Sequence, residues 1–427
     1  MKICLIIPPS PFLGDEKRNT PLGILYIASW LEKHGHEIFM VDLRGTNPLS
    51  WSREIPNVSL YGITATTPEY PYAIQIANDI KICINKHAII ILGGVHGTAE
   101  PNNIDPIFDK VIRGEGELSI LELIYDLKNG KKKRFYSCPS QVDRINDLDS
   151  LPFPARHLLP KESIVSYTST IKGEASTTII GSRGCPYNCA FCASKVMWNR
   201  KVKYRSPDNI IAEIKEVIMD YEVTHFRFQD DTIIASKKWI TELCEKMKPL
   251  GITWRGTTRV DHSQKDILQL MKEAGCYEIA YGIETLDDKV LKMNNKQITN
   301  EEIHEAIINA KSVGLKTRLF FMIGLPGQDV NIADDIISFI EECQPEAVNL
   351  STFVPLPGSD IYNNPEKYGI KISTEDWNKF IMSKGLYGTE MDDPFIFTHD
   401  KLADCVLRAL RKQLLEYFAN HNLIYNK

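Results

Sequence analysis

Short apolar runs alternate with segments of helical period over the first 128 residues. The runs predict β-strands at Ile3–Ile7, Glu37–Val41, Leu60–Ile63, Ala88–Leu92 and Lys110–Ile112. Between them apolar residues recur three or four positions apart, which predicts helices at Leu22–His34, Tyr70–Lys86 and Leu118–Leu127. Strands that alternate with helices are typical of an α/β domain with a doubly wound parallel sheet. Residues 1–128 are therefore predicted to form a Rossmann-like domain.

The same alternation resumes after a proline-rich and charged stretch, residues 129–175, which we interpret as a linker. Strands are predicted to end near Ile180, Phe228, Gly256, Tyr281, Ile323 and Phe353. Six strand–helix units predict a partial (β/α)6 barrel of the TIM type over residues 176–365. Apolar positions at helical spacing in Asp400–Phe418 predict a small helical C-terminal segment, residues 366–427.

Three cysteines lie within eight residues, directly after the first predicted barrel strand. Cys185, Cys189 and Cys192 have the spacing C-x3-C-x2-C. Three thiolates on one loop can hold three irons of a [4Fe–4S] cluster, which leaves the fourth iron open to a small molecule. A disulfide would leave one cysteine over, and a structural zinc ion needs four ligands where only one C-x2-C occurs. The spacing favours the cluster; zinc and chance clustering are the alternatives.

This loop, with Phe191 just before its last cysteine, resembles the signature of the radical S-adenosylmethionine (SAM) superfamily. The resemblance implies that the open iron binds SAM and that SAM is cleaved reductively to a 5′-deoxyadenosyl radical. It implies an adenine contact for Phe191 and further SAM contacts at the strand ends. These positions are Asp230, Asp231, Glu284, Arg318, Ile323 and Gly324.

The strand-end residues also have simpler interpretations. Asp230 and Asp231 could bind a metal or an ammonium group, but aspartate is also favoured as a helix N-cap. Arg318 is as well explained by a structural salt bridge as by a ligand contact, and the same holds for Arg255 and Arg259.

Polar and glycine-rich stretches follow the strands of the first domain, where ligands of doubly wound sheets bind. No Gly-x-Gly-x-x-Gly follows the first strand, which disfavours a nicotinamide site. The order of Pro8-Pro9, Pro21-Leu22-Gly23, Gly-Gly-x-His and Arg-Gly-Glu-Gly-Glu resembles the cobalamin-binding domain ahead of many radical SAM cores, over most of residues 1–125. The resemblance implies cobalamin contacts at Ser10, Thr64, Thr66, Glu69, Tyr70, Gly93, Gly94, His96, Gly114, Glu115 and Glu117.

One motif of other cobalamin proteins is absent. The sequence has no Asp-x-His-x-x-Gly, which supplies a lower axial histidine elsewhere. Cobalamin is therefore expected to bind without histidine ligation, with Glu69 or Tyr70 near the cobalt. A domain that has lost cobalamin is the alternative.

Composition excludes several classes of partner. The 427 residues are 43% hydrophobic and 25% charged, as in soluble globular proteins. A net charge of −5 gives no electrostatic reason to expect nucleic acid or an anionic membrane. No run approaches the roughly 20 apolar residues of a membrane span, and the N-terminus reads as a strand rather than a signal peptide. An oxygen-sensitive cluster and free cysteines suit the cytoplasm.

The sequence thus predicts a cobalamin-dependent radical SAM enzyme that methylates an unactivated carbon of a small molecule or natural product. An external reductant such as a flavodoxin or ferredoxin is expected, because no second cluster motif occurs. The alternatives are a ring contraction or cyclisation without methyl transfer, and a SAM- or cobalamin-binding sensor without turnover. No catalytic side chain is predicted.

Overall fold

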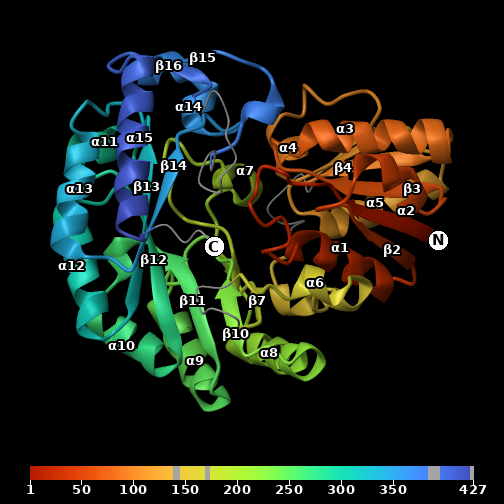
Figure 1. Cartoon of the computed structure of the whole chain (residues 1–427). Helices are drawn as coiled ribbons and strands as arrows, with labels where there is room; N and C mark the ends of the chain where they lie inside the picture. Colours follow the sequence, from red (N-terminus) through yellow and green to blue (C-terminus); the bar gives the residue numbers. More distant parts are fainter. Residues whose placement is uncertain (138–144, 169–173, 383–394, 424–427) are drawn as a thin grey trace. The chain divides into compact units, whose positions relative to one another are not determined.

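The computed structural model describes residues 1–137, 145–168, 174–382 and 395–423 (Figure 1). The chain divides into two compact units. The first comprises Met1–Ser166 with the short segments Val196–Asn199 and Asp376–Asn378. The second comprises Tyr167–Lys195, Arg200–Glu375 and Lys379–Lys427. Each unit is built on its own six-stranded parallel sheet.

The sheet of the first unit contains all five strands predicted there and one more. Its order is β2-β1-β3-β4-β5-β6, and every neighbouring pair is parallel. The strands are β1 (Lys2–Ile7), β2 (Glu37–Asp42), β3 (Leu60–Thr64), β4 (Ile89–Gly93), β5 (Lys110–Arg113) and β6 (Phe135–Ser137). The last of them comes from the segment interpreted as a linker. The chain order reverses between β1 and β3, so a ligand crevice is expected at their carboxyl ends.

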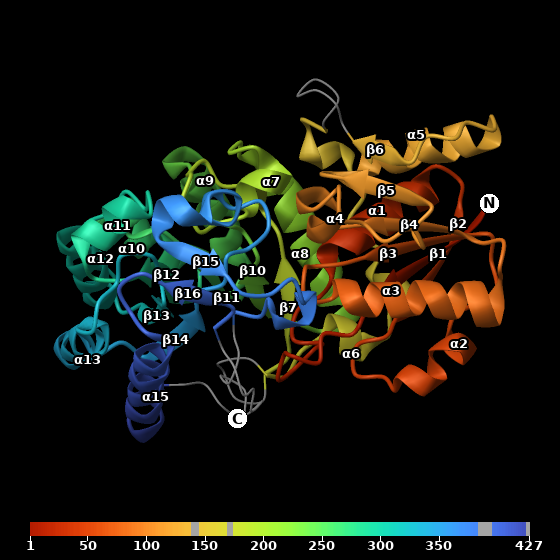
Figure 2. The same cartoon turned by 90° about the horizontal axis from the view of Figure 1, so that it is seen from above.

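Helices cover both faces of this sheet, as a doubly wound fold requires. Figure 2 shows α1 (Leu22–Lys33) and α5 (Gly116–Lys128) on one side, with α2 (Trp51–Glu54) and α3 (Tyr70–Asp79) on the other. The three predicted helices are confirmed, and α3 continues into a π-helical turn, Ile80–Ile84. The short helices α2 and α4 (Val95–Ala99) escaped prediction because four or five residues cannot display a helical period.

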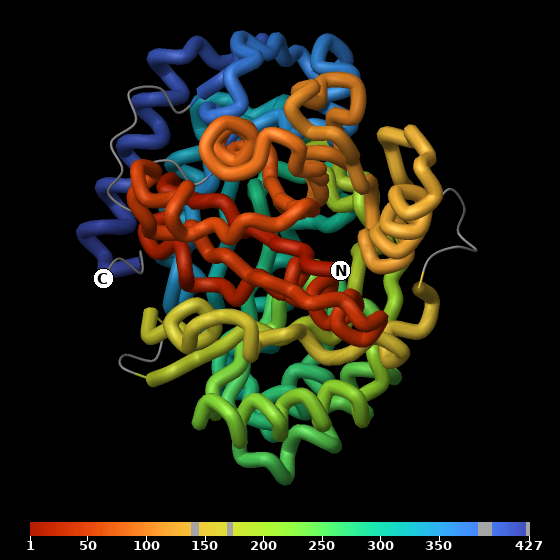
Figure 3. Tube along the Cα trace, turned by 90° about the vertical axis from the view of Figure 1, so that its right-hand side faces the viewer, coloured from red at the N-terminus to blue at the C-terminus, as the bar shows by residue number. Residues whose placement is uncertain are grey.

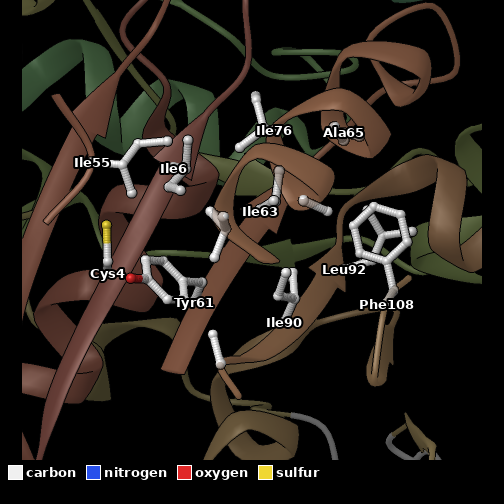
Figure 4. Close-up of a cluster of buried hydrophobic side chains, with 14 of the residues drawn as sticks. Cys4, Ile6, Ile55, Tyr61, Ile63, Ala65, Ile76, Ile90, Leu92 and Phe108 are labelled. Carbon is white, nitrogen blue, oxygen red and sulfur yellow. The ribbon is translucent and has the colours of Figure 1, made fainter. Parts of the chain in front are cut away.

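Alternate side chains of the central strands form the core of the first unit. One cluster of buried side chains contains Cys4 and Ile6 of β1, Tyr61 and Ile63 of β3, Ile90 and Leu92 of β4, and Ile76 of α3 (Figure 4). A strand buried on both faces reads as a continuous apolar run, which is why these strands were visible in the sequence. Each large side chain contributes roughly 1.5–3 kcal/mol by its burial.

The second unit is a curled parallel sheet of order β14-β13-β12-β11-β10-β7. Its strands are β7 (Ser176–Ile179), β10 (His225–Phe228), β11 (Thr253–Thr258), β12 (Cys276–Glu284), β13 (Lys316–Ile323) and β14 (Ala347–Thr352). The outer side carries α8 (Pro207–Tyr221), α9 (Lys237–Met247), α10 (Lys265–Glu273), α12 (Asn300–Ser312) and α13 (Ile332–Cys343) (Figure 1). The predicted partial barrel of six strand–helix units is confirmed.

Local signals fix several of these elements. Ser206 caps α8 by accepting a hydrogen bond from the Asn209 N–H, and Thr299 and Glu302 form a capping box at α12. The strands β11 and β12 extend past their predicted ends at Gly256 and Tyr281. The pairing of β12 with β13 shifts register between Gly282 and Glu284, and Glu284 pairs with Phe321 beyond the shift. This extension brings Glu284 to the strand end beside the cysteine loop.

The remaining elements are short, except for the last helix, and Figure 3 follows the backbone through them in sequence colours. They include the antiparallel pairs β8 (Ser182–Arg183) with β9 (Lys203–Tyr204) and β15 (Ile370–Ile372) with β16 (Phe397–His399). The short helices are α6 (Lys161–Ile164), α7 (Ser194–Trp198), α11 (Asp288–Met293) and α14 (Asp360–Asn363). The long helix α15 (Asp404–Asn420) confirms the C-terminal helical prediction. None of the helices in the described ranges is both long and apolar enough to cross a membrane.

Candidate active site

The loop that carries the three cysteines is fastened at its start by Asp230. This residue follows β10 and is almost fully buried. Its carboxylate accepts hydrogen bonds from the Gly181 N–H (3.0 Å) and the Ser182 hydroxyl (2.5 Å). Burial raises the pKa of Asp230 to about 6, and the two hydrogen bonds oppose that rise. Asp230 therefore anchors the start of the loop.

The middle of the loop is fastened by the chain that follows α11. The Asn294 carbonyl accepts the Ala190 N–H at 2.8 Å, and the Asn295 side chain donates to the Asn188 carbonyl at 2.7 Å. A third hydrogen bond joins the Ile361 N–H to the Ala190 carbonyl at 3.1 Å. The backbone between the cysteines is thus held from two directions before any ligand is bound.

The three thiols suit a cluster better than a single metal ion. Cys189 is buried, Cys185 and Cys192 are half-buried, and burial raises the pKa of each; that of Cys192 rises to about 11. Thiols bind metals as thiolates, so cluster binding would release their protons. Within the described ranges no three His, Cys, Asp or Glu side chains converge as ligands of one ion. A [4Fe–4S] cluster spreads its thiolates over separate irons, so the loop fits this group.

The second aspartate of the pair occupies a different environment. Asp231 accepts a hydrogen bond from the Ser194 hydroxyl at 2.8 Å and is exposed, whereas Asp230 is enclosed. Its charge raises the pKa of Cys185 and of Cys192, after the larger effect of burial. A carboxylate that is exposed on the cysteine side can receive an ammonium group.

Glu284 and Phe191 meet at a lysine that the sequence did not single out. The Lys296 ammonium lies 3.1 Å from Glu284 Oε1 and 5.7 Å from the centre of the Phe191 ring. Glu284 has a positive φ of 71°, a strained conformation for a residue with a side chain. Asn295 and Gln297, on either side of the lysine, also have positive φ values. Strain of this kind persists only where the surroundings hold it in place.

A second cation lies against the cysteine loop. The Arg259 guanidinium is 3.6 Å from the centre of the Tyr187 ring and pairs with Asp261 at 3.0 Å. Its Nη2 also donates to the Gln297 carbonyl at 3.1 Å. The Tyr187 hydroxyl is hydrogen-bonded to His262 Nε2. Arg259 therefore pairs with a carboxylate and also touches the loop.

Arg318 lies in a buried ion-pair network partway along β13. It donates to Glu278 Oε1 at 2.9 Å and Oε2 at 3.2 Å, and to the Asn349 side chain at 3.1 Å. Arg255 joins the same carboxylate at 2.8 Å. The two guanidinium groups hold the pKa of Glu278 below its usual range against the opposing effect of burial. The structure thus places Arg318 in the barrel interior rather than at the strand end.

Ile323 and Gly324 end β13, and their backbone groups already have partners. The Ile323 carbonyl accepts the Phe353 N–H at 2.8 Å. The Gly324 N–H donates to Gln328 Oε1 at 2.8 Å. Gly324 has φ +91°, and a Cβ there would meet the Phe397 ring at 2.9 Å. This glycine therefore allows close packing of β16 against the turn.

In the first unit, the predicted polar residues meet at the switch point between β1 and β3. The Ser10 hydroxyl donates to Glu69 Oε1 at 2.5 Å, and the Thr66 N–H donates to Glu69 Oε2 at 2.8 Å. The Ser10 N–H donates to Glu16 Oε2 at 2.6 Å. One carboxylate thus ties the loop after β1 to the loop after β3. Thr64 ends β3 beside Gly93.

The turn after β4 packs against the loop after β3 so closely that no side chain fits at Gly94. Gly94 has φ +91°, and a Cβ there would lie 2.7 Å from the Ala65 carbonyl oxygen. Hydrogen bonds from the Ala65 N–H to the Gly93 carbonyl and from the His96 N–H to the Ala65 carbonyl join the two loops. A Cβ on Gly93 would meet nothing within 4 Å, so this glycine borders open space.

His96 and Tyr70 belong to the core. The imidazole is completely buried, stacks on the Tyr70 ring at 3.9 Å and meets Trp377 edge-on at 5.1 Å. Its Nε2 has no hydrogen-bond partner in the described part of the chain. Burial lowers the pKa of His96 to about 4, so the ring is neutral near pH 7. The Tyr70 hydroxyl accepts the Asp105 N–H at 2.6 Å.

The last predicted group lies where β5 meets α5. Gly114 has φ +72°, and its N–H donates to the Thr98 hydroxyl at 2.9 Å. Glu115 and Glu117 are both buried at the start of α5. Buried carboxylates gain from the positive end of a helix dipole, so their position is understandable without a ligand.

The structure thus brings the three cysteines together with Phe191, Asp231 and Glu284, and separately brings Ser10, Thr66 and Glu69 together. It places Arg318 apart in its ion-pair network. Lys296 and Tyr187 were missed by the sequence analysis. The only signal was the polar run Asn294–Gln297 after an amphipathic segment, which is ordinary in a loop.

Two family models match the chain. The radical SAM superfamily model matches residues 179–340, and the B12 binding domain model matches residues 16–124. The chain therefore carries a radical SAM domain and, ahead of it, a B12-binding domain. These domains imply an enzyme that uses a [4Fe–4S] cluster, SAM and cobalamin, together with a small-molecule substrate and a source of electrons.

Similar proteins agree with this assignment. The uncharacterized methyltransferase PH0819 of Pyrococcus horikoshii is 27% identical, over 98% of this chain and 92% of its own. The anaerobic magnesium-protoporphyrin IX monomethyl ester cyclase of Rubrivivax gelatinosus is 27% identical, over 84% of this chain and 68% of its own. Among solved structures, the cobalamin-dependent SAM radical enzyme OxsB has a TM-score of 0.70 at 15% identity and covers 98% of this chain and 67% of its own. That likeness supports the fold.

Proposed function

We propose that this enzyme methylates a carbon atom of a small-molecule substrate and uses SAM both as radical source and as methyl donor. The observation that carries the proposal is the presence of both cofactor domains in one chain, each with its polar residues at the carboxyl ends of a parallel sheet. The similarity to a protein named as a methyltransferase over nearly its whole length supports it.

In the second unit, Cys185, Cys189 and Cys192 hold the cluster. The bound cluster supplies the electron that cleaves SAM, and cobalamin supplies the methyl-transfer chemistry. Asp231, exposed on the cysteine side, receives the SAM ammonium group. Phe191 packs against the adenine, and Glu284, fixed by Lys296, accepts hydrogen bonds from the ribose or methionine end of SAM.

In the first unit, the loops at the switch point hold cobalamin without a histidine ligand. Glu69 fixes the loop after β3 through its bonds to Ser10 and Thr66. Gly93, which borders open space, allows backbone to approach the corrin closely. His96 supports the turn after β4 from the core as a neutral, buried ring.

Electrons for SAM cleavage come from an external one-electron donor such as a flavodoxin or a ferredoxin. The only cluster motif of the sequence is the one that binds SAM. An oxygen-sensitive cluster and nine described cysteines without a disulfide suit the reducing cytoplasm, which is the compartment we propose.

Anaerobic reconstitution with iron, sulfide and cobalamin tests methylation before any substrate is known. With SAM and a strong reductant, the enzyme is expected to release 5′-deoxyadenosine and, only when cobalamin is bound, S-adenosylhomocysteine. Release of 5′-deoxyadenosine without any S-adenosylhomocysteine would contradict methyl transfer.

A cyclisation is the second candidate, because the Rubrivivax gelatinosus cyclase has the same 27% identity as the methyltransferase, over a smaller share of both chains. Both candidates share radical generation and cobalamin. They differ in the product mass: methylation adds one CH2 to the substrate, whereas ring formation does not.

A further inference from the structure

Two cations lie against aromatic rings of the cysteine loop, and both are almost fully buried. Arg259 is 6% exposed and Lys296 is also 6% exposed. Arg259 contacts the loop through the Tyr187 ring, and Lys296 contacts it through the Phe191 ring. Buried cations are costly unless anions lie close by, so the placement of two beside one loop calls for an explanation.

Each cation has one carboxylate partner, but the Arg259 guanidinium keeps one nitrogen without a hydrogen bond among the described residues. Asp261 and the Gln297 carbonyl use Nε and Nη2 of Arg259. Nη1 of the same side chain is buried and has no hydrogen-bond partner within the described residues. Lys296 has Glu284 at 3.1 Å. A further anion beside these two groups would complete their surroundings.

The two cations contact the loop on either side of Cys189 in the sequence, because Tyr187 lies two residues before this cysteine and Phe191 two residues after it. Asn295, next to Lys296, also donates a hydrogen bond to the Asn188 carbonyl, directly before Cys189. Asp231 instead contacts the chain at Ser194, beyond Cys192. The positive charges therefore flank the segment that carries Cys189.

We propose that Lys296 and Arg259 act as positioning residues that raise the reduction potential of the cluster through positive charge held beside Cys189. A cluster held by three thiolates becomes more negative by one unit when it accepts an electron. A nearby cation stabilises the reduced form more than the oxidised form, and burial keeps solvent from screening the effect. The negative charge of Glu284 lowers the reduction potential and so opposes the two cations, until SAM binds and donates hydrogen bonds to this carboxylate.

The proposal rests on the cluster and does not depend on methyl transfer. Its failure leaves the S-adenosylhomocysteine test untouched, and failure of that test leaves the cluster potential unaltered. The two hypotheses are therefore distinguishable.

The test is a potentiometric titration of the cluster-loaded full chain without SAM, followed by electron paramagnetic resonance of the reduced cluster. Lys296→Gln is expected to lower the reduced-to-oxidised ratio at a fixed potential about tenfold, which corresponds to a midpoint about 59 mV lower for one electron. Lys296→Arg keeps the charge and is expected to keep the wild-type ratio. Lys292→Gln, an exposed lysine on α11, is the matched control.

Glu284→Gln separates a charge effect from a structural one. Removal of this negative charge is expected to raise the ratio, opposite to Lys296→Gln, whereas damage to the loop would shift both variants alike or release iron. Arg259→Lys should retain the wild-type ratio and Arg259→Gln should lower it. Equal ratios in Lys296→Gln and Lys292→Gln, or shifts of the same sign in Lys296→Gln and Glu284→Gln, would overturn the proposal.

Discussion

The cysteine loop and the switch-point loops occupy the same architectural position and are held in different ways. Both follow parallel strands at the carboxyl edge of a sheet. The cysteine loop is held by charged groups: Asp230 at its start, and Arg259 and Lys296 on its rings. The switch-point loops are held by the carboxylates of Glu69 and Glu16, by Gly94 and by the neutral ring of His96.

The difference follows from the chemistry that each region must hold. A cluster and SAM carry concentrated charge, so fixed charges nearby change their energy strongly. A corrin ring is large and flat, so it needs a backbone surface without obstructing side chains. Changes to charge should therefore act mainly on the cysteine loop, and changes to shape mainly on the switch-point loops.

The largest effect is expected from Cys189→Ala. Loss of one thiolate should abolish cluster assembly and SAM cleavage, because the remaining two thiolates can hold only two of the four irons. Cobalamin binding, followed by visible absorption, should persist. The exposed Cys405 provides the control variant Cys405→Ala, which should retain full iron content. Retention of a cluster in Cys189→Ala would break the assignment of the loop.

The glycine pair tests the shape argument in the first unit. Gly94→Ala should destabilise this unit by roughly 2–4 kcal/mol, because the positive φ disfavours a side chain and the new Cβ meets the Ala65 backbone. Thermal unfolding measures the loss. Gly93→Ala adds the same methyl group into open space, so stability should stay unchanged while cobalamin affinity falls. Equal melting temperatures for the two variants would contradict the argument.

A fall in pH should change the stability contributions of His96 in the first unit and Asp230 in the second unit in opposite directions. Burial lowers the pKa of His96 to about 4 from its ordinary 6.5, so its contribution is present above pH 6.5 and is lost as pH falls through about 4. Burial raises the pKa of Asp230 to about 6 from 3.8, so its contribution is present below 3.8 and is lost as pH rises through about 6. Each effect spans at most about 3 kcal/mol.

Urea unfolding at pH 4.5 and pH 7.5 measures both effects. The stability difference between wild type and His96→Gln should shrink towards the acid side, and that between wild type and Asp230→Asn should grow there. Parallel behaviour of the two variants would show that the buried groups do not titrate as described.

The smallest effect is expected from Ser10→Ala. This change removes the hydrogen bond to Glu69 and should cost about 1 kcal/mol of stability. Cobalamin affinity should fall, because the loop after β1 loses its tie to the loop after β3, while 5′-deoxyadenosine formation from SAM continues. Ser59→Ala, at an exposed serine of the same unit, serves as the comparison. An unchanged cobalamin affinity would contradict the assignment of Ser10 to the cobalamin site.

Much of the architecture could be predicted because buried parallel strands leave a continuous apolar signal. The strands from β1 to β5 and the helices α1 and α5 lie where their patterns predicted them, to within a few residues. The strand β6 was not predicted, because three residues are too few to show an alternating or apolar pattern. The predicted ends of β11 and β12 lie a few residues before the observed ends, because Thr257 and Gly282 are not typical of a buried strand. That difference matters, because β12 delivers Glu284.

The sequence by itself determined the class of chemistry, because C-x3-C-x2-C places three ligands on one short loop and local spacing is enough to specify them. It also determined the two parallel-sheet domains, through their apolar period. Only the tertiary structure decided which polar residues serve the loop. Lys296 lies more than one hundred residues from Phe191 in the sequence, and Asp230 differs from Asp231 only in what surrounds it. Burial, charge and contact arise from packing between distant segments, and no local pattern records them.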